Sequence, residues 1–193
     1  MTRKRPALDR LASLTFTHRV PMSTLEEIIR SERRRYELAV HEAGHAVAGV
    51  VLGGQLLRAE ITDQTGLTSF EPDTFPPGRT AAIAYAGPWS ELRGIHRRPP
   101  TLRELYAVLC SSRDQDALCA AGGTVAGRDV VPLLSRCWDA IDTLAGKLNR
   151  TSCVTHRDVC DALGLSRDPA TRAVELAMIR SGSRPGTFTV STP

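Results

Sequence analysis

The chain has 193 residues, of which 41% are hydrophobic and 24% are charged, as is typical of one globular domain with a core of its own. The net charge of +4 is small, and no basic stripe alternates with aromatic residues, so we expect no nucleic-acid partner. No apolar run approaches the roughly 18 residues of a transmembrane helix, and no signal peptide is visible, so we expect a cytoplasmic protein without a membrane span.

The order of polar and apolar segments predicts a mainly α-helical fold in three parts. Residues 1–22 are polar and contain two prolines, and we expect a flexible tail. Residues 23–165 contain several segments of helical apolar periodicity, and we expect them to form the folded domain. Residues 166–193 predict a C-terminal helix, from about Pro169 to Arg180, followed by a disordered end.

The folded part begins with a helix that Ser23 or Thr24 caps. A basic run, Arg33 to Arg35, follows and leads into the next helix. Such a run is typical of a solvated face, and the alternative is a contact for an acidic partner.

The next helix carries the sequence His-Glu-Ala-Gly-His at positions 41–45, which fits the His-Glu-x-x-His pattern of zinc metallopeptidases. Because one helical turn has 3.6 residues, His41 and His45 lie on one face and can bind the same metal ion. Glu42 lies beside the first ligand, where it suits a general base that takes a proton from a zinc-bound water. Most of this helix is apolar, so two buried imidazoles are costly unless a partner such as Zn²⁺ binds them. The alternative is a chance match with two ordinary core histidines.

Residues 55–70 predict a small β-hairpin beside this helix. Its first strand lies within residues 55–62, its turn at residues 63–66 and its second strand at residues 67–70. Two interpretations are open. The hairpin can simply cover the helix, or its free edge can pair with an extended peptide beside the metal.

The rest of the domain is expected to be helical. After a loop at residues 71–79, helices are predicted at residues 80–93, 102–109, 114–121 and 129–149, with a short one from about Thr155.

A catalytic zinc site takes three protein ligands and a water, so the third ligand must come from elsewhere in the chain. The candidates that follow the motif include Glu60, Asp63, Glu71, Asp73, Glu91, His96, Glu104, Asp114 and Asp116. A carboxylate on a helix packed against the motif helix has the best geometry, and this favours Glu91, Asp114 and Asp116 without choosing among them.

The segment from His41 to Ala46, His-Glu-Ala-Gly-His-Ala, resembles the signature of the FtsH-type peptidase domain. Three further segments resemble that family in order and spacing. The family's strand and turn resemble Glu-Ile-Thr at positions 60–62 and Gly-Leu-Thr at positions 66–68. The family's Gly-Gly-Arg-Ala-Ala-Glu segment resembles Ala-Gly-Pro-Trp-Ser-Glu at positions 86–91. Its helix start, with Asn-Asp-x-x-x-Ala, resembles the segment from Ser112 to Ala120. The closing helices also agree, so the resemblance covers about residues 25–165.

The resemblance implies a helical metallopeptidase domain with a bound Zn²⁺. Alignment on Ala120 implies Asp116 as the third zinc ligand, with Asp114 as the alternative. Glu91 is implied to orient a ligand or a water molecule, as residues behind metal ligands do. The strand at residues 66–68, which comprises Gly66, Leu67 and Thr68, is expected to bind a peptide substrate.

The resulting prediction is a zinc-dependent endopeptidase that acts on unfolded or extended protein segments. We expect a stand-alone peptidase domain without the membrane anchor and the ATPase module of the FtsH family. An ATPase that acts in trans and a homo-oligomer are the possible protein partners. Two alternatives are a weakly active metal-binding regulatory module and a dedicated protease of one regulatory protein.

Overall fold

The computed structural model describes residues 22–75, 78–110 and 112–188, and within these ranges it is mainly α-helical with a small antiparallel sheet. The predicted fold class is therefore confirmed. Of the tail expected at residues 1–22, residues 1–21 lie outside the described residues, as do the last five residues, and Met22 is the first residue of α1. The elements are α1 Met22–Val51, β1 Leu56–Ile61, β2 Gly66–Phe70, α2 Thr80–His96, α3 Leu102–Leu109, α4 Asp114–Ala120, η1 Arg128–Val130, α5 Val131–Arg136, α6 Trp138–Thr151, β3 Cys153–Val154, α7 His156–Ala162 and α8 Pro169–Arg180.

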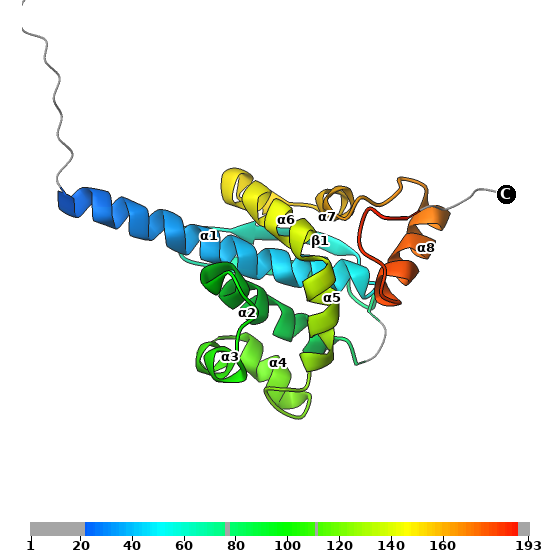
Figure 1. Cartoon of the computed structure of the whole chain (residues 1–193), viewed down its shortest axis with the longest axis horizontal. Coiled ribbons are helices and arrows are strands. Elements are labelled where there is room, and N and C mark those ends of the chain that lie inside the picture. Colours follow the sequence, from blue (N-terminus) through cyan, green and yellow to red (C-terminus); the bar gives the residue numbers. More distant parts are fainter. Residues whose placement is uncertain (1–21, 76–77, 111, 189–193) are drawn as a thin grey trace, which may run out of the picture.

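Helix α1 is the central element of the fold (Figure 1). The two helices predicted for this region are one continuous helix of 30 residues. Its N-terminal part, up to Arg34, is exposed and projects beyond the other elements, whereas Ala39 to Leu52 is almost entirely buried between α2 and α6. Neither α1 nor any other helix in the described ranges is both long and apolar enough to cross a membrane.

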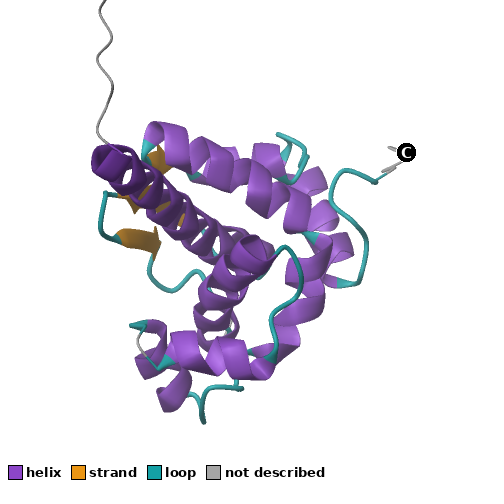
Figure 2. Ribbon diagram, turned by 60° about the vertical axis from the view of Figure 1, so that its left-hand side comes forward, coloured by secondary structure: helices purple, strands orange, loops and turns teal. Residues whose placement is uncertain are grey.

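The hairpin lies alongside the buried part of α1 and gains a third strand (Figure 2). The strand order is β2-β1-β3, with both pairs antiparallel, and Ala59 pairs with Thr68 on one side and with Val154 on the other. The two-residue strand β3 was not predicted, because so short a segment has no periodicity. Strand β2 therefore forms one edge of the sheet.

The basic run on α1 makes contacts within the chain. Arg35 donates hydrogen bonds to the carbonyl oxygen of Asn149 at 3.2 Å and to the hydroxyl of Ser152 at 2.6 Å, and its guanidinium pairs with Asp63 in the hairpin turn. Arg33 pairs with Glu37 one turn further along α1. Arg35 thus joins α1, the end of α6 and the hairpin.

The later helices follow the predicted order with one difference. The helix expected at residues 129–149 is divided into η1, α5 and α6, because the backbone departs from helical geometry at Cys137 (φ −90°, ψ 10°). Helix α8 has the predicted bounds and is held to the domain by the buried Ile179 and by Arg180, which donates to the carbonyl oxygen of Val51 at 2.8 Å. After α8, residues 181–188 form turns, and Phe188 packs against the core.

Helices α1 and α2 approach each other closely at Gly44. A Cβ atom at this position would lie 2.5 Å from Ser90 Oγ and 2.8 Å from the carbonyl oxygen of Ala86, so any larger residue would push α2 away. This contact matters for the site, because α2 also carries Gly87 and Glu91.

The substitution Gly44→Ala should therefore lower the free energy of unfolding by about 1–3 kcal/mol, as overpacking does, although alanine is the better helix former. Gly146→Ala in α6 is the matched control. Its Cβ would meet only Arg150 Nη1 at 3.5 Å, so it should raise stability by up to about 1 kcal/mol. Chemical denaturation measures both, and equal effects of the two substitutions would contradict close packing at Gly44.

Candidate metal centre

The imidazoles of His41 and His45 are held from behind by two residues of α2. His41 Nδ1 lies 2.8 Å from Glu91 Oε2, and His45 Nδ1 lies 2.7 Å from the carbonyl oxygen of Ile83. Both partners are acceptors, so each Nδ1 carries the proton and donates it, which leaves the two Nε2 atoms for another partner. These Nε2 atoms face each other at 3.0 Å. Glu91 thus orients a histidine, as the resemblance implies.

The third group at this point is Asp114, at the start of α4. Its Oδ2 lies 3.2 Å from His41 Nε2, and its Oδ1 lies 3.3 Å from His45 Nε2. Ser112 fixes the segment, since its hydroxyl accepts from the Asp114 backbone N–H at 3.1 Å and donates to Asp114 Oδ2 at 3.2 Å. Asp116, the preferred ligand from the sequence, is exposed and is not part of this cluster. The choice between the two aspartates is corrected to Asp114, because two residues along a helix turn a side chain by about 200°.

The three side chains can hold a metal ion. Tetrahedral zinc with bonds of about 2.0–2.1 Å places its ligand atoms about 3.3 Å apart. The two Nε2 atoms are 3.0 Å apart, and each lies 3.2 or 3.3 Å from one of the two Asp114 oxygens. The side chains are 14%, 10% and 18% exposed for His41, His45 and Asp114, so they are shielded without being closed off from solvent.

Gly87 leaves the space that an ion needs. A Cβ atom at position 87 would lie 2.3 Å from His45 Nε2 and 2.7 Å from His41 Nε2, so any other residue would fill the region in front of both nitrogen atoms. In the middle of α2 a glycine costs about 1 kcal/mol of helix stability relative to alanine. The space that glycine leaves at the two Nε2 atoms explains why this helical position is a glycine.

The electrostatics of the cluster favour a positive charge at this point. Burial favours neutral His41, but hydrogen bonds to Asp114 and Glu91 outweigh it and raise the pKa of His41 to about 10. Burial likewise opposes ionisation of Asp114, but the two imidazoles hold the pKa of its carboxyl well below the usual range. A cluster that stabilises a cation in this way is suited to a divalent metal.

Glu42, the predicted general base, is buried next to the cluster and faces β2. Its carboxylate accepts a hydrogen bond of 2.6 Å from the hydroxyl of Thr68, and Gly66 lies against it. Leu67, between these two, points outward and is 54% exposed. Of the three residues expected to bind substrate, Thr68 and Gly66 thus contact Glu42, and the role of the strand in substrate binding stays a prediction.

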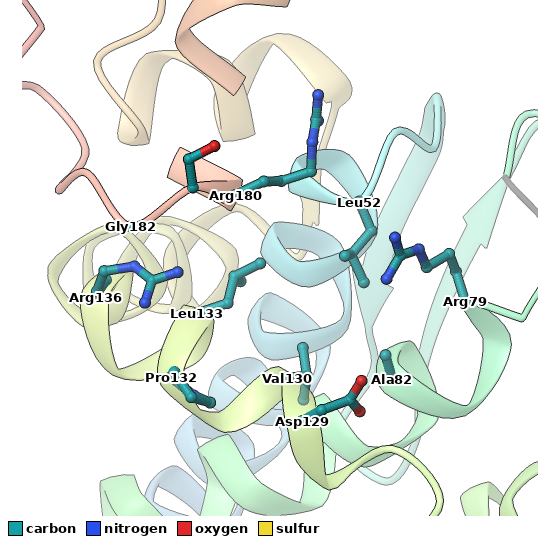
Figure 3. A pocket seen from close by; sticks show the side chains of 11 residues that line it. Leu52, Arg79, Ala82, Asp129, Val130, Pro132, Leu133, Arg136, Arg180 and Gly182 are labelled. Atoms are coloured by element: carbon teal, nitrogen blue, oxygen red, sulfur yellow. The ribbon is translucent and has the colours of Figure 1, made fainter. Parts of the chain in front are cut away.

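A pocket of about 380 Å³ lies elsewhere on the molecule, where the end of α1 meets α2, η1, α5 and the end of α8 (Figure 3). The guanidinium groups of Arg79 and Arg136 point into it from opposite sides, and Leu52 and Leu133 line it between them. None of the predicted site residues lines this pocket, so the catalytic prediction does not depend on it.

Three contributions to the centre were not predicted from the sequence, and one of them is the space that Gly87 leaves. Ile83 contributes through its backbone carbonyl group, which every residue type has, so the sequence does not indicate this role. Ser112 could have been found, because a serine before a helix often accepts a hydrogen bond from the backbone N–H two residues further along the chain.

Asp114→Asn should abolish tight metal binding, because it removes an anionic ligand, whereas Asp116→Asn should leave it unchanged. Elemental analysis of the purified variants is expected to give about one equivalent of metal for Asp116→Asn and for the wild type, and much less for Asp114→Asn. If only Asp116→Asn lost the metal, Asp116 would be the third ligand, as the resemblance implies.

Gly87→Ala should lower the metal content as strongly as the loss of a ligand while the chain stays folded, because the added methyl group occupies the space at both Nε2 atoms. Circular dichroism would report the fold, and Gly146→Ala is again the control, with full metal content expected. A Gly87→Ala protein that binds one equivalent of metal would show that the ion binds elsewhere.

No protein-family model matches this chain, and no curated protein matches it significantly. The candidate metal centre therefore rests on the positions of the chain's own residues: His41, His45 and Asp114 converge on one point, and they can hold a metal ion.

Proposed function

We propose that the protein is a zinc-dependent endopeptidase that hydrolyses peptide bonds in unfolded or extended protein segments. The observation that carries this proposal is the convergence of His41, His45 and Asp114 beside the buried carboxylate of Glu42. Two nitrogen ligands and one carboxylate, with a separate acid in reach, are the side chains that zinc peptidases use.

Zinc is the metal that fits the ligand types best. Imidazole and carboxylate ligands in a roughly tetrahedral arrangement are typical of catalytic zinc sites with three protein ligands. A zinc ion held there would supply Lewis acidity, which lowers the pKa of water and polarises a peptide carbonyl group.

The chain's own residues account for the remaining steps of the proposed reaction. Glu91 and the Ile83 carbonyl keep both histidines in the tautomer that binds metal through Nε2. Glu42 accepts a proton from the attacking water and delivers it to the leaving amine, so one carboxylate serves both as base and as acid. Strand β2, at the edge of the sheet, offers backbone groups to an extended peptide next to Glu42.

The position of β2 at the edge of the sheet indicates the class of substrate. An extended segment can pair with β2 through its backbone whatever its side chains are, which suits unfolded proteins better than folded ones.

The decisive experiment compares the wild type with Glu42→Gln on a fluorescently labelled unfolded protein such as casein. Glutamine keeps the size of the side chain but cannot accept the proton, so the rate should fall by a factor of about 10² to 10⁴ while the metal content is unchanged. Removing the metal with a chelator should abolish the wild-type activity, and added Zn²⁺ should restore it.

A Glu42→Gln variant with the full wild-type rate would refute this mechanism. A wild type that binds zinc but cleaves neither casein nor any other unstructured protein would favour a metal-binding regulatory module instead.

A further inference from the structure

The carboxylate of Glu42 has one hydrogen-bond donor among the described residues, the hydroxyl of Thr68. Thr68 Oγ1 lies 2.6 Å from Glu42 Oε2, the length of a strong hydrogen bond to an ionised acid. The same hydroxyl lies 3.3 Å from the Glu42 carbonyl oxygen. Since Glu42 is only 5% exposed, water does little to fix the orientation of this carboxylate.

Gly66 lies against the other carboxylate oxygen of Glu42, Oε1. A Cβ atom at position 66 would lie 2.3 Å from Glu42 Oε1 and 2.7 Å from Cδ. The two oxygens therefore have different surroundings, since Oε2 accepts from a hydroxyl and Oε1 packs against the backbone of Gly66. One oxygen is anchored by a hydrogen bond, and the other has no hydrogen-bond donor among the described residues.

We propose that Thr68 is a positioning residue for the general base: its hydroxyl anchors Glu42 Oε2, so that Oε1 is the atom that accepts and returns the proton. This inference rests on the proposed peptidase function. Holding a catalytic group in one orientation removes the entropic cost of finding that orientation in each turnover.

The choice of threonine fits this role. Thr68 pairs with Ala59 in the middle of the sheet register, so its backbone is fixed by β1. Its β-branched side chain restricts rotation about χ1, so the hydroxyl is held over Glu42 more rigidly than that of a serine. In a strand, alternate residues face opposite sides, and the outward position belongs to the exposed Leu67. The proposal thus gives the Thr68 side chain a different role from the substrate contact that the sequence predicts for this strand.

The first test is steady-state kinetics with a fluorogenic peptide. Thr68→Val keeps the shape and removes the hydroxyl, so kcat should fall by roughly 10- to 100-fold, the range expected for loss of a hydrogen bond to a charged group. KM and zinc content should stay within about twofold, because valine leaves the strand and the metal ligands in place. Thr68→Ser should recover most of kcat, which a role in packing alone would not produce.

Ser69→Ala is the matched control, because it removes the next hydroxyl along the strand, which contacts the Arg58 carbonyl oxygen instead of Glu42. Its kcat should equal that of the wild type. If Thr68→Val retained the wild-type kcat, or lost no more than Ser69→Ala, the positioning role would be refuted.

The second test does not depend on cleavage. Thr68→Val, Glu42→Leu and the double variant form a cycle whose denaturation midpoints report the coupling between the two side chains. Thr68→Val should lower the midpoint in the wild type, where it leaves a buried carboxylate without a donor, and change it little in Glu42→Leu. Additive effects would refute the contact itself.

The two tests together separate this inference from the proposed function. An active wild type whose Thr68→Val variant is equally active overturns the positioning role alone. An inactive, zinc-loaded wild type with clear coupling overturns the peptidase function and the catalytic role of Thr68, and it reduces the contact to a structural one.

Discussion

The centre depends on the close packing of α2 against α1. The two histidines belong to α1, but every group that orients them or leaves them space, except Asp114, comes from α2. Gly44 allows the two helices to approach, and this approach brings Glu91 and the carbonyl of Ile83 within hydrogen-bond distance of the imidazoles. A shift of about 1 Å between the helices would break both hydrogen bonds, since such bonds weaken steeply beyond about 3.2 Å.

The charges of the cluster follow from the same packing. Two carboxylates, Asp114 and Glu91, lie against His41 from opposite sides, and burial keeps water from screening them. The raised pKa of His41 is a consequence, since an imidazolium is the cation that the chain itself can place there. Bringing acids around a histidine costs free energy unless a positive charge is present, and a divalent ion would satisfy this requirement better than one proton.

The parts of the site that could be predicted are those that one helix fixes by itself. The spacing of His41 and His45 is a local property, and the structure places both imidazoles together for that reason. The third member of the cluster depends on how α4 is joined to α3. An offset of two residues separates Asp114, which lies in the cluster, from Asp116, which the resemblance implies. Strand β3 is defined by its pairing with β1, a tertiary contact that leaves no periodicity in the sequence.

The contact of Thr68 with Glu42 could not be predicted from the sequence either. Its sequence position marks it as a strand residue near the motif, which agrees with a role at the substrate edge. Only the register of β2 against β1 and the path of α1 beneath the sheet reveal that its hydroxyl reaches Glu42.

The two interpretations of the hairpin are compatible because a strand has two faces and an edge. The inward side of β2 covers α1 and contacts Glu42 through Thr68 and Gly66, so the hairpin does cover the motif helix. Its outer edge is a separate surface of backbone groups, and covering α1 does not use it. If a peptide pairs with that edge, the strand that aligns the peptide is also the strand whose Thr68 hydroxyl orients Glu42, the proposed general base.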